Sequence, residues 1–361
     1  MAASPWVRAG ITAAAMLTVA VVALGYRMLE SHGAFTTVTP GFSGTCVGVP
    51  TARGPEDIVI DAVHKVAFIS ATDRPARAGG KPSAADGLYS YAYLEPGAKP
   101  VKLAGTPGDF HPHGLSLYRA PDGSMTLMAI NHRLDGSNSV DIFSVEINGT
   151  AAHATEIGSI TGGVLASPNA LAAIDEDRFY VVNDHTSKTA LGRWLDDNLL
   201  LPRADVLYFD GMKFNEVATG LNYPNGVALS DDGKYLYVPE AFARVLLTFE
   251  RNPFSGELHQ VGVLDIPSNL DNARVAADGS VWIGSHPKAY AMAAMRRDPG
   301  KPAPSEIFRV SVENGLPRGA TLVYADRGSQ IGGASVGAPS DGRLLIGSPL
   351  DDKILNCVLP R

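Results

Sequence analysis

"YPNGVALSDDGKYLYVPEA", residues 223–241, is the stretch of sequence that decides the fold. A small or polar opening that contains Asn225 leads into a short apolar run, and the Asp232-Gly233 pair separates it from a second apolar run. Asp-Gly between two apolar runs is a strong β-hairpin signal, because glycine accepts the positive φ that such turns need. The stretch therefore predicts two short antiparallel strands.

The same pattern recurs along the chain. Related segments begin at Pro55, His111, Ser167, Tyr223, Leu270 and Gly332, and the turn is Asp-Gly in four of the six. Five segments carry a polar residue near the start: Glu56, His113, Asn169, Asn225 and Asp271, which are 57, 56, 56 and 46 positions apart. Repeats of this length, made of short strands, indicate radial repetition. We therefore predict an all-β fold, a six-bladed β-propeller.

The polar openings predict a metal site. The start of each innermost strand of a propeller faces the central channel, so these residues should converge on one axis. Those with side-chain oxygen donors are Glu56, Asn169, Asn225, Asp271 and Asn272. Two carboxylates and three amides form a hard, weakly charged oxygen set that suits calcium better than zinc. The alternative is that each residue only forms a turn or caps a strand.

Two histidines belong to the same region. His113, in "FHPHGLSLY" (110–118), has the blade position of the oxygen donors, and His132 ends the second apolar run of that blade. The two strand ends should meet, which lets one imidazole accept a proton from water and the other relay it. Calcium beside them would polarise a carbonyl. The residues thus favour metal-assisted hydrolysis of esters or lactones over structural histidines.

The composition excludes one class of partner. The chain has 361 residues and a formal net charge of −7, and we find no basic patch. Nucleic-acid binding needs such a patch, so we expect no nucleic-acid partner. The 38 glycines and 25 prolines fit many short strands joined by turns.

The N-terminal region differs from the rest. Between Arg8 and Arg27 lie 18 uncharged residues, "AGITAAAMLTVAVVALGY", which is just enough to cross a bilayer as a helix. We expect a signal anchor or transmembrane segment over 1–30, a linker over 31–45 and the propeller hydrolase domain over 46–361. The alternatives are a cleaved signal, since "ALG" can precede a cut, and a buried helix. Both export alternatives place the folded domain outside the cytoplasm, membrane-anchored or secreted.

The two cysteines, Cys46 and Cys357, stand at opposite ends of the presumed domain. In an exported protein this placement suggests a disulfide that ties the ends together, and two unrelated buried thiols are the alternative.

One segment interrupts the strand pattern. Within "TSKTALGRWLDDNLLLP", residues 186–202, the large apolar residues follow helical spacing. We expect a short amphipathic helix that packs on the propeller face; a helix over the site or at a membrane is the alternative.

The motifs "GPEDIVI", "FHPHGLS", "INH", "FYVVNDH", "NGVALSDDGKYLYVPE", "LDNARV", "VWIGSHP" and "LLIGS", in this order, resemble the serum paraoxonase/arylesterase family from about Cys46 to Cys357. The resemblance implies a six-bladed propeller with two calcium ions in its channel, lactonase and aryl-esterase activity, a retained hydrophobic N-terminus and a disulfide joining the ends.

The resemblance also assigns residues. It implies that Glu56, Asn169, Asn225, Asp271 and Asn272 hold the catalytic calcium and that His113 and His132 form the catalytic dyad. His111 takes an asparagine's place and is not the base, and Asp184 and His286 match residues just outside the site.

Two departures from the family matter. Its deeper, structural calcium would use Asp57, the backbone carbonyl of Leu115 and an aspartate directly after Asn169, where this chain has Ala170. We therefore expect one calcium ion held tightly and a second weak or absent, unless water or Asp184 compensates. The region after "NDH" is shorter and more polar, which puts the lid and substrate choice in question.

The sequence thus predicts a calcium-dependent hydrolase of lactones and aryl esters. A gluconolactonase-type sugar-lactone hydrolase is the second hypothesis, although such sites use fewer ligands and no histidine pair of this kind. A non-catalytic, ligand-binding propeller is the third.

Overall fold

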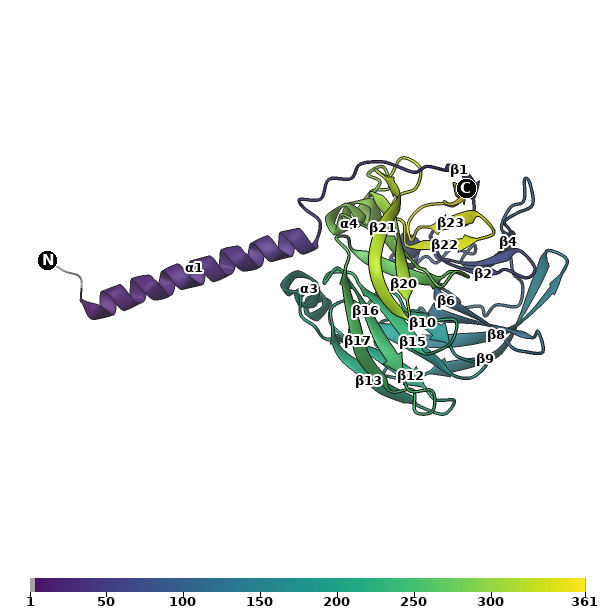
Figure 1. The fold of residues 1–361 in the computed structure, drawn as a ribbon, viewed down its shortest axis with the longest axis horizontal. Helices are drawn as coiled ribbons and strands as arrows, with labels where there is room; N and C mark the ends of the chain where they lie inside the picture. Colours follow the sequence, from purple (N-terminus) through teal and green to yellow (C-terminus); the bar gives the residue numbers. More distant parts are fainter. Residues whose placement is uncertain (1–3, 361) are drawn as a thin grey trace.

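The computed structural model describes residues 4–360, so residues 1–3 of the expected segment 1–30 and residue 361 of the expected domain 46–361 lie outside the described residues. A long helix, α1 (Pro5–Ser31), projects from a disc of six four-stranded antiparallel sheets (Figure 1). The six-bladed β-propeller with an apolar N-terminal helix is therefore confirmed.

Five blades are formed by four consecutive strands each. The first contains β2 (Pro55–Asp61), β3 (Val66–Ala71), β4 (Gly87–Ala92) and β5 (Val101–Lys102). The second contains β6 (Pro112–Arg119), β7 (Met125–His132), β8 (Asn138–Asn148) and β9 (Ala151–Thr161). The third contains β10 (Pro168–Ala173), β11 (Phe179–Asn183), β12 (Ala204–Phe209) and β13 (Phe214–Leu221). The fourth contains β14 (Ala228–Leu229), β15 (Tyr235–Glu240), β16 (Val245–Arg251) and β17 (Leu258–Asp265). The fifth contains β18 (Leu270–Val275), β19 (Val281–Ser285), β20 (Ser305–Glu313) and β21 (Leu316–Asp326).

Each sequence repeat forms the two innermost strands of one blade. The glycines of the four Asp-Gly turns all have positive φ: Gly123 at 91°, Gly233 at 69°, Gly279 at 77° and Gly342 at 72°. A residue with a Cβ is strained in this conformation, so the turn chemistry that predicted the hairpins is confirmed.

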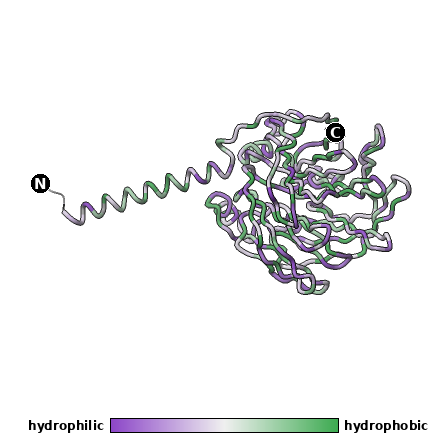
Figure 2. Tube along the Cα trace, in the orientation of Figure 1, coloured by the Kyte–Doolittle hydropathy of each residue, from purple (hydrophilic) through white to green (hydrophobic). Residues whose placement is uncertain are grey.

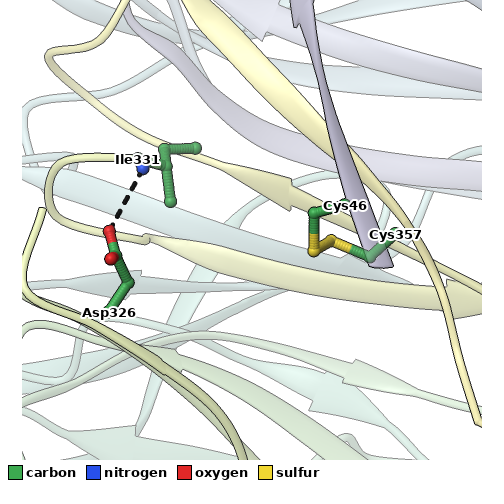
Figure 3. Close-up of a disulfide and its surroundings, with 4 residues drawn as sticks. All are labelled: Cys46, Asp326, Ile331 and Cys357. Carbon is green, nitrogen blue, oxygen red and sulfur yellow. Dashed lines mark hydrogen bonds between the residues drawn. A yellow bond between two sulfur atoms is a disulfide. The ribbon is translucent and has the colours of Figure 1, made fainter. Parts of the chain in front are cut away.

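The sixth blade joins the two ends of the chain. It contains β22 (Val336–Ser340), β23 (Arg343–Gly347) and β24 (Lys353–Val358), and its outer strand is β1 (Thr45–Pro50). Cys46 of β1 pairs in register with Cys357 of β24, and a disulfide joins them (Figure 3). The predicted disulfide is confirmed, and it fastens the strand pair that closes the ring.

Apolar side chains pack between neighbouring blades. Between the second and third blades, for example, Met128 and Ile130 pack with Leu171 and Val181, and all four are fully buried or nearly so. Burial of this kind recurs around the ring and fixes the relative positions of the inner strands.

The other helices gather on the face where the inner strands begin. The helices α2 (Arg74–Ala78), α3 (Ala190–Leu199) and α4 (Ala289–Arg297) follow the second strands of the first, third and fifth blades. Because β-strands alternate in direction, the end of a second strand lies beside the start of the first. The end of α1 docks there too: Asn269 Nδ2 donates to the Ser31 carbonyl at 2.7 Å, and the Ser31 hydroxyl donates to the Phe242 carbonyl at 2.6 Å.

Helix α1 is long and apolar enough to cross a membrane. The stretch Ile11–Ser31 has a mean hydropathy of 1.7, and none of its apolar window is buried in the fold. Figure 2 shows this run projecting away from the propeller. A soluble core helix would be buried, so the alternative of a buried helix is wrong.

Helix α3 confirms the expected helix within residues 186–202. Thr189 caps its N-terminus, since its hydroxyl accepts a hydrogen bond from the Gly192 amide at 3.0 Å. Leu191 and Trp194 remain 67% and 57% exposed, so the apolar residues are only partly covered by the propeller.

Candidate active site

The polar residues reach the channel because the inner strands bulge at their starts. The pairing of the first two strands shifts between Pro55 and Asp57, Pro112 and Leu115, Pro168 and Ala170, and Leu270 and Ala273. The residues left out of these pairings include Glu56, His113, Asn169, Asp271 and Asn272. A β-bulge re-aims a side chain, and here it releases polar groups from the sheets toward the axis.

Two glycines next to these residues allow the inner strands to approach closely. A Cβ on Gly226 would lie 2.6 Å from the Asp271 carbonyl oxygen, and one on Gly114 would lie 2.5 Å from the Asn169 carbonyl oxygen. A side chain at either position would therefore push two blades apart. This explains why glycine follows Asn225 and His113 in the sequence.

Contacts across the channel bring the five oxygen-bearing residues together. Asn272 Nδ2 donates to Glu56 Oε1 at 2.7 Å, although the two residues belong to the fifth and first blades. Asn169 Nδ2 donates to Asn225 Oδ1 at 2.7 Å, and Asn225 Nδ2 reaches the Leu270 carbonyl, next to Asp271, at 3.4 Å. All five side chains are buried.

The donor set fits a calcium ion. Three of its buried oxygens have no hydrogen-bond donor: Glu56 Oε2, Asn169 Oδ1 and Asn272 Oδ1. Buried acceptors are rarely left unpaired, and a cation satisfies them without a donor. Because amides supply three of the five side chains, the described residues contain no cluster of three or more His, Cys, Asp or Glu of the kind that marks a zinc site.

The two carboxylates have different environments. Burial raises the pKa of Glu56, but the charges and hydrogen bonds of His113 and the nearby Arg74 outweigh it and lower the pKa to about 2. Burial dominates at Asp271 and raises its pKa to about 6, although His286 Nε2 lies 2.7 Å from Asp271 Oδ2 and opposes the rise. Arg74 Nη2 lies 3.7 Å from Glu56 Oε2, a neighbour that no motif indicated.

His113 and His132 form a hydrogen-bonded pair, with His113 Nδ1 2.8 Å from His132 Nε2. The proton positions follow from the next residue in the chain of bonds. Asn138 Nδ2 donates to the Leu165 carbonyl at 2.9 Å, so its Oδ1 faces His132 Nδ1 at 2.7 Å and accepts that proton. Neutral His132 then accepts at Nε2, His113 donates from Nδ1, and the lone pair of His113 is at Nε2.

That lone pair faces the oxygen set. His113 Nε2 lies 3.6 Å from Glu56 Oε1, so a proton taken up at Nε2 would sit beside a carboxylate. Burial, followed by repulsion from His113, lowers the pKa of His132 to about 3. His132 therefore stays neutral and orients His113, rather than holding a charge itself.

The neighbouring residues surround this site without joining it. His111 is buried, and its nitrogens contact Asp86 at 2.8 Å and Asp109 at 3.2 Å instead of the channel set. Asp184 Oδ2 accepts a hydrogen bond from Asn169 at 3.1 Å. His185 links Asp184, at 2.9 Å, to Asp197 of α3, at 2.8 Å, and so ties that helix to the site.

The residues of the expected deeper site lie below this set. Asp57 is fully buried, and its Oδ2 accepts a hydrogen bond from the Leu115 amide at 2.7 Å. The Arg274 guanidinium contacts both Asp57 Oδ1 and the Leu115 carbonyl. Beneath it a cavity of about 670 Å³ opens at the other end of the channel; its lining includes Leu115 and Arg274 but none of the five oxygen-bearing residues.

The channel of this six-bladed propeller contains a buried oxygen set and a histidine pair. Residues 56–359 match the family model described as "Arylesterase", and the chain belongs to this family. It is 31% identical to serum paraoxonase/arylesterase 2 of Homo sapiens over 69% of each chain. It is 29% identical to serum paraoxonase/arylesterase 1 of Mus musculus over 96% of this chain and 100% of that protein.

Solved structures agree on the fold. A luciferin-regenerating enzyme superposes with a TM-score of 0.54 over 88% of this chain and 95% of its own, at 11% identity. The calcium-binding protein regucalcin from Agrobacterium tumefaciens superposes with a TM-score of 0.50 over 90% of this chain and 98% of its own, at 12% identity. Family membership therefore suggests an ester hydrolase, and these structures support the propeller alone.

Proposed function

We propose that this protein is a calcium-dependent hydrolase of lactones and aryl esters. The observation that carries the proposal is the orientation of His113, whose unprotonated Nε2 faces the buried oxygen set while His132 holds its Nδ1 at 2.8 Å. Glu56, Asn169, Asn225, Asp271 and Asn272 would hold the ion. When bound, calcium supplies a Lewis acid that polarises the substrate carbonyl.

The chain's own residues carry the proton. A water between substrate and His113 loses its proton to Nε2 as it attacks the carbonyl carbon. The resulting imidazolium is stabilised by Glu56, 3.6 Å away, and is held in place by the bond to His132. The proton on Nε2 is then available to the leaving alkoxide or phenoxide, which returns His113 to its starting state.

The proposal is tested by measuring hydrolysis of phenyl acetate, aliphatic lactones and gluconolactone before and after exhaustive chelation. We expect activity on the first two substrate classes, loss on chelation and recovery with calcium. Full activity in protein shown by metal analysis to be calcium-free would exclude the proposed mechanism. Activity on gluconolactone alone would favour the sugar-lactone hydrolase, and inactivity throughout would favour a ligand-binding propeller.

We further propose that α1 remains attached and anchors the domain outside the cytoplasm. The apolar helix and the disulfide both indicate export, and Ser31 and His32 at the end of α1 are buried against the propeller. The protein should stay in the membrane pellet after alkaline carbonate extraction and keep its full-length mass. A soluble product cut after Gly25 would instead identify a cleaved signal.

A further inference from the structure

A cationic side chain lies on the channel axis directly below the candidate active site. Arg274 is in the strand β18, three residues after Asp271, and its side chain is only 15% exposed. It reaches from the fifth blade to residues of the first and second blades. A long cation in the middle of a propeller is unusual, because burial of an unpaired charge is costly.

Each nitrogen of this guanidinium contacts an oxygen atom. Its Nε donates to the Ile58 carbonyl at 2.8 Å, and Nη1 donates to the Ala273 carbonyl at 2.8 Å. Its Nη2 contacts Asp57 Oδ1 and donates to the Leu115 carbonyl at 3.3 Å. One carboxylate and three carbonyls form the kind of oxygen set that a hard cation takes, and here a side chain fills it.

Asp57 needs this cation. It is fully buried, and its carboxylate otherwise accepts hydrogen bonds from two backbone amides, those of Ile58 at 2.9 Å and Leu115 at 2.7 Å. A buried carboxylate is stable only with a positive partner close by. Arg274 supplies that charge permanently, because a guanidinium does not lose its proton in proteins.

We propose that Arg274 takes the place of a second, deeper metal ion, so that the protein needs one calcium for catalysis and none to hold its channel together. Ala170 fits this arrangement, since it adds no carboxylate beside Asp57 and is 2% exposed among apolar neighbours. The inference rests on the proposed function only for the first ion. Under this proposal, Arg274 keeps the inner strands of the first, second and fifth blades joined in calcium-free medium.

The first experiment counts metal in the full-length wild-type protein after equilibration with micromolar calcium and removal of the free ion. We expect one calcium per chain by elemental analysis. Two tightly held ions per chain would overturn the inference. If the protein holds no calcium tightly, this result would count against the proposed hydrolase mechanism. It would still agree with a guanidinium in the deeper position.

The second experiment measures thermal unfolding in the presence of chelator, which separates the role of Arg274 from activity. Arg274→Met and Asp57→Asn should each lower the Tm by roughly 6–15 °C, because each leaves a buried partner unpaired. The double variant should lose clearly less than the sum of the two, because neither charge remains.

Arg309→Met is the matched control. Arg309 pairs with Asp278 at 2.7 Å on the propeller surface, where both side chains are about half exposed, and its loss should change the Tm little. An Arg274→Met variant as stable as Arg309→Met, or strictly additive losses at Asp57 and Arg274, would overturn the inference. If Arg274→Met does not fold, the double variant still decides, since it should be recovered folded.

Discussion

His113 can act as a base only while its Nε2 keeps a lone pair, and its neighbours enforce that state. The order of protons runs from the Leu165 carbonyl through Asn138 and His132 to His113. Once one group in this series of hydrogen bonds acts as a donor or as an acceptor, the role of the next group is determined. A backbone carbonyl in a loop therefore sets the tautomer of a side chain that faces the buried oxygen set.

Replacing His113 by Gln should lower the turnover of aryl esters by about 10²–10⁴-fold, the usual contribution of a general base. Calcium affinity should stay nearly unchanged, because His113 is not among the oxygen donors. His132→Gln should cost less, since a glutamine can still accept the proton of His113 Nδ1. Turnover and calcium content are measured for each variant.

His111→Gln is the control for this series. It lies in the same stretch but bonds to Asp86, so it should lower thermal stability and leave turnover almost unchanged. A severe loss of turnover in His111→Gln, or loss of calcium in His113→Gln, would contradict the assignment of the base.

Some of these site residues could be predicted from the sequence, and others could not. His113 and the oxygen set stand at repeated positions, so their convergence follows from the repeat. Asn138 has no such mark, because its contact with His132 depends on the register between β7 and β8. Arg274 looks like an ordinary strand residue, and only three-dimensional closeness to Asp57 reveals its partner.

At the scale of elements, α3 is attached to the site through one histidine. Burial lowers the pKa of His185, but hydrogen bonds to Asp184 and Asp197 outweigh it and raise the pKa to about 9. Burial has the opposite effect on Asp184 and raises its pKa, but hydrogen bonding and charge from His185 outweigh burial and lower the pKa to about 2. The protonated histidine thus links the helix to Asn169 through Asp184.

This link should weaken at high pH. A histidine whose pKa is higher in the folded state stabilises that state fully below its unfolded pKa of about 6.5, and the contribution is lost as the pH rises through about 9. We expect the Tm to fall by roughly 2–4 °C for each kcal/mol lost between pH 6.5 and 9.5. The His185→Gln variant should show a weaker dependence of Tm on pH. Calorimetry and the fluorescence of Trp194 on α3 measure this dependence.

The exposed His259 provides the comparison, since His259→Gln should keep the wild-type profile. A pH profile that is identical in wild type and His185→Gln would show that another group controls the attachment of α3.

At the scale of the whole molecule, the repeats predicted the ring but not how it closes. Six hairpins with Asp-Gly turns or related openings were visible in the sequence, as was a disulfide between distant cysteines. The fourth strand of the last blade was not, because β1 has no turn linking it to its partner β24. Strand pairing between remote segments leaves no local signal for a hairpin rule to detect.

Replacing both cysteines by serine should destabilise the protein by about 2–5 kcal/mol, because a cross-link over so long a loop restricts the unfolded chain strongly. The backbone pairing of Cys46 with Cys357 remains, so the variant should fold and unfold at lower urea. Urea midpoints of the double variant and of the reduced wild type should agree. Equal midpoints for oxidised wild type and double variant would contradict a stabilising role.

The disulfide can form only late in the synthesis of the chain. The two cysteines are 311 positions apart, so at ribosomal rates Cys46 waits roughly 15–60 s before Cys357 is made. No third cysteine exists in the sequence, so the waiting thiol has no wrong partner within its own chain. Until then, only thiols or disulfides of other molecules can pair with it. Oxidation then marks the molecule as finished, because the bond can form only once the last blade has been synthesised.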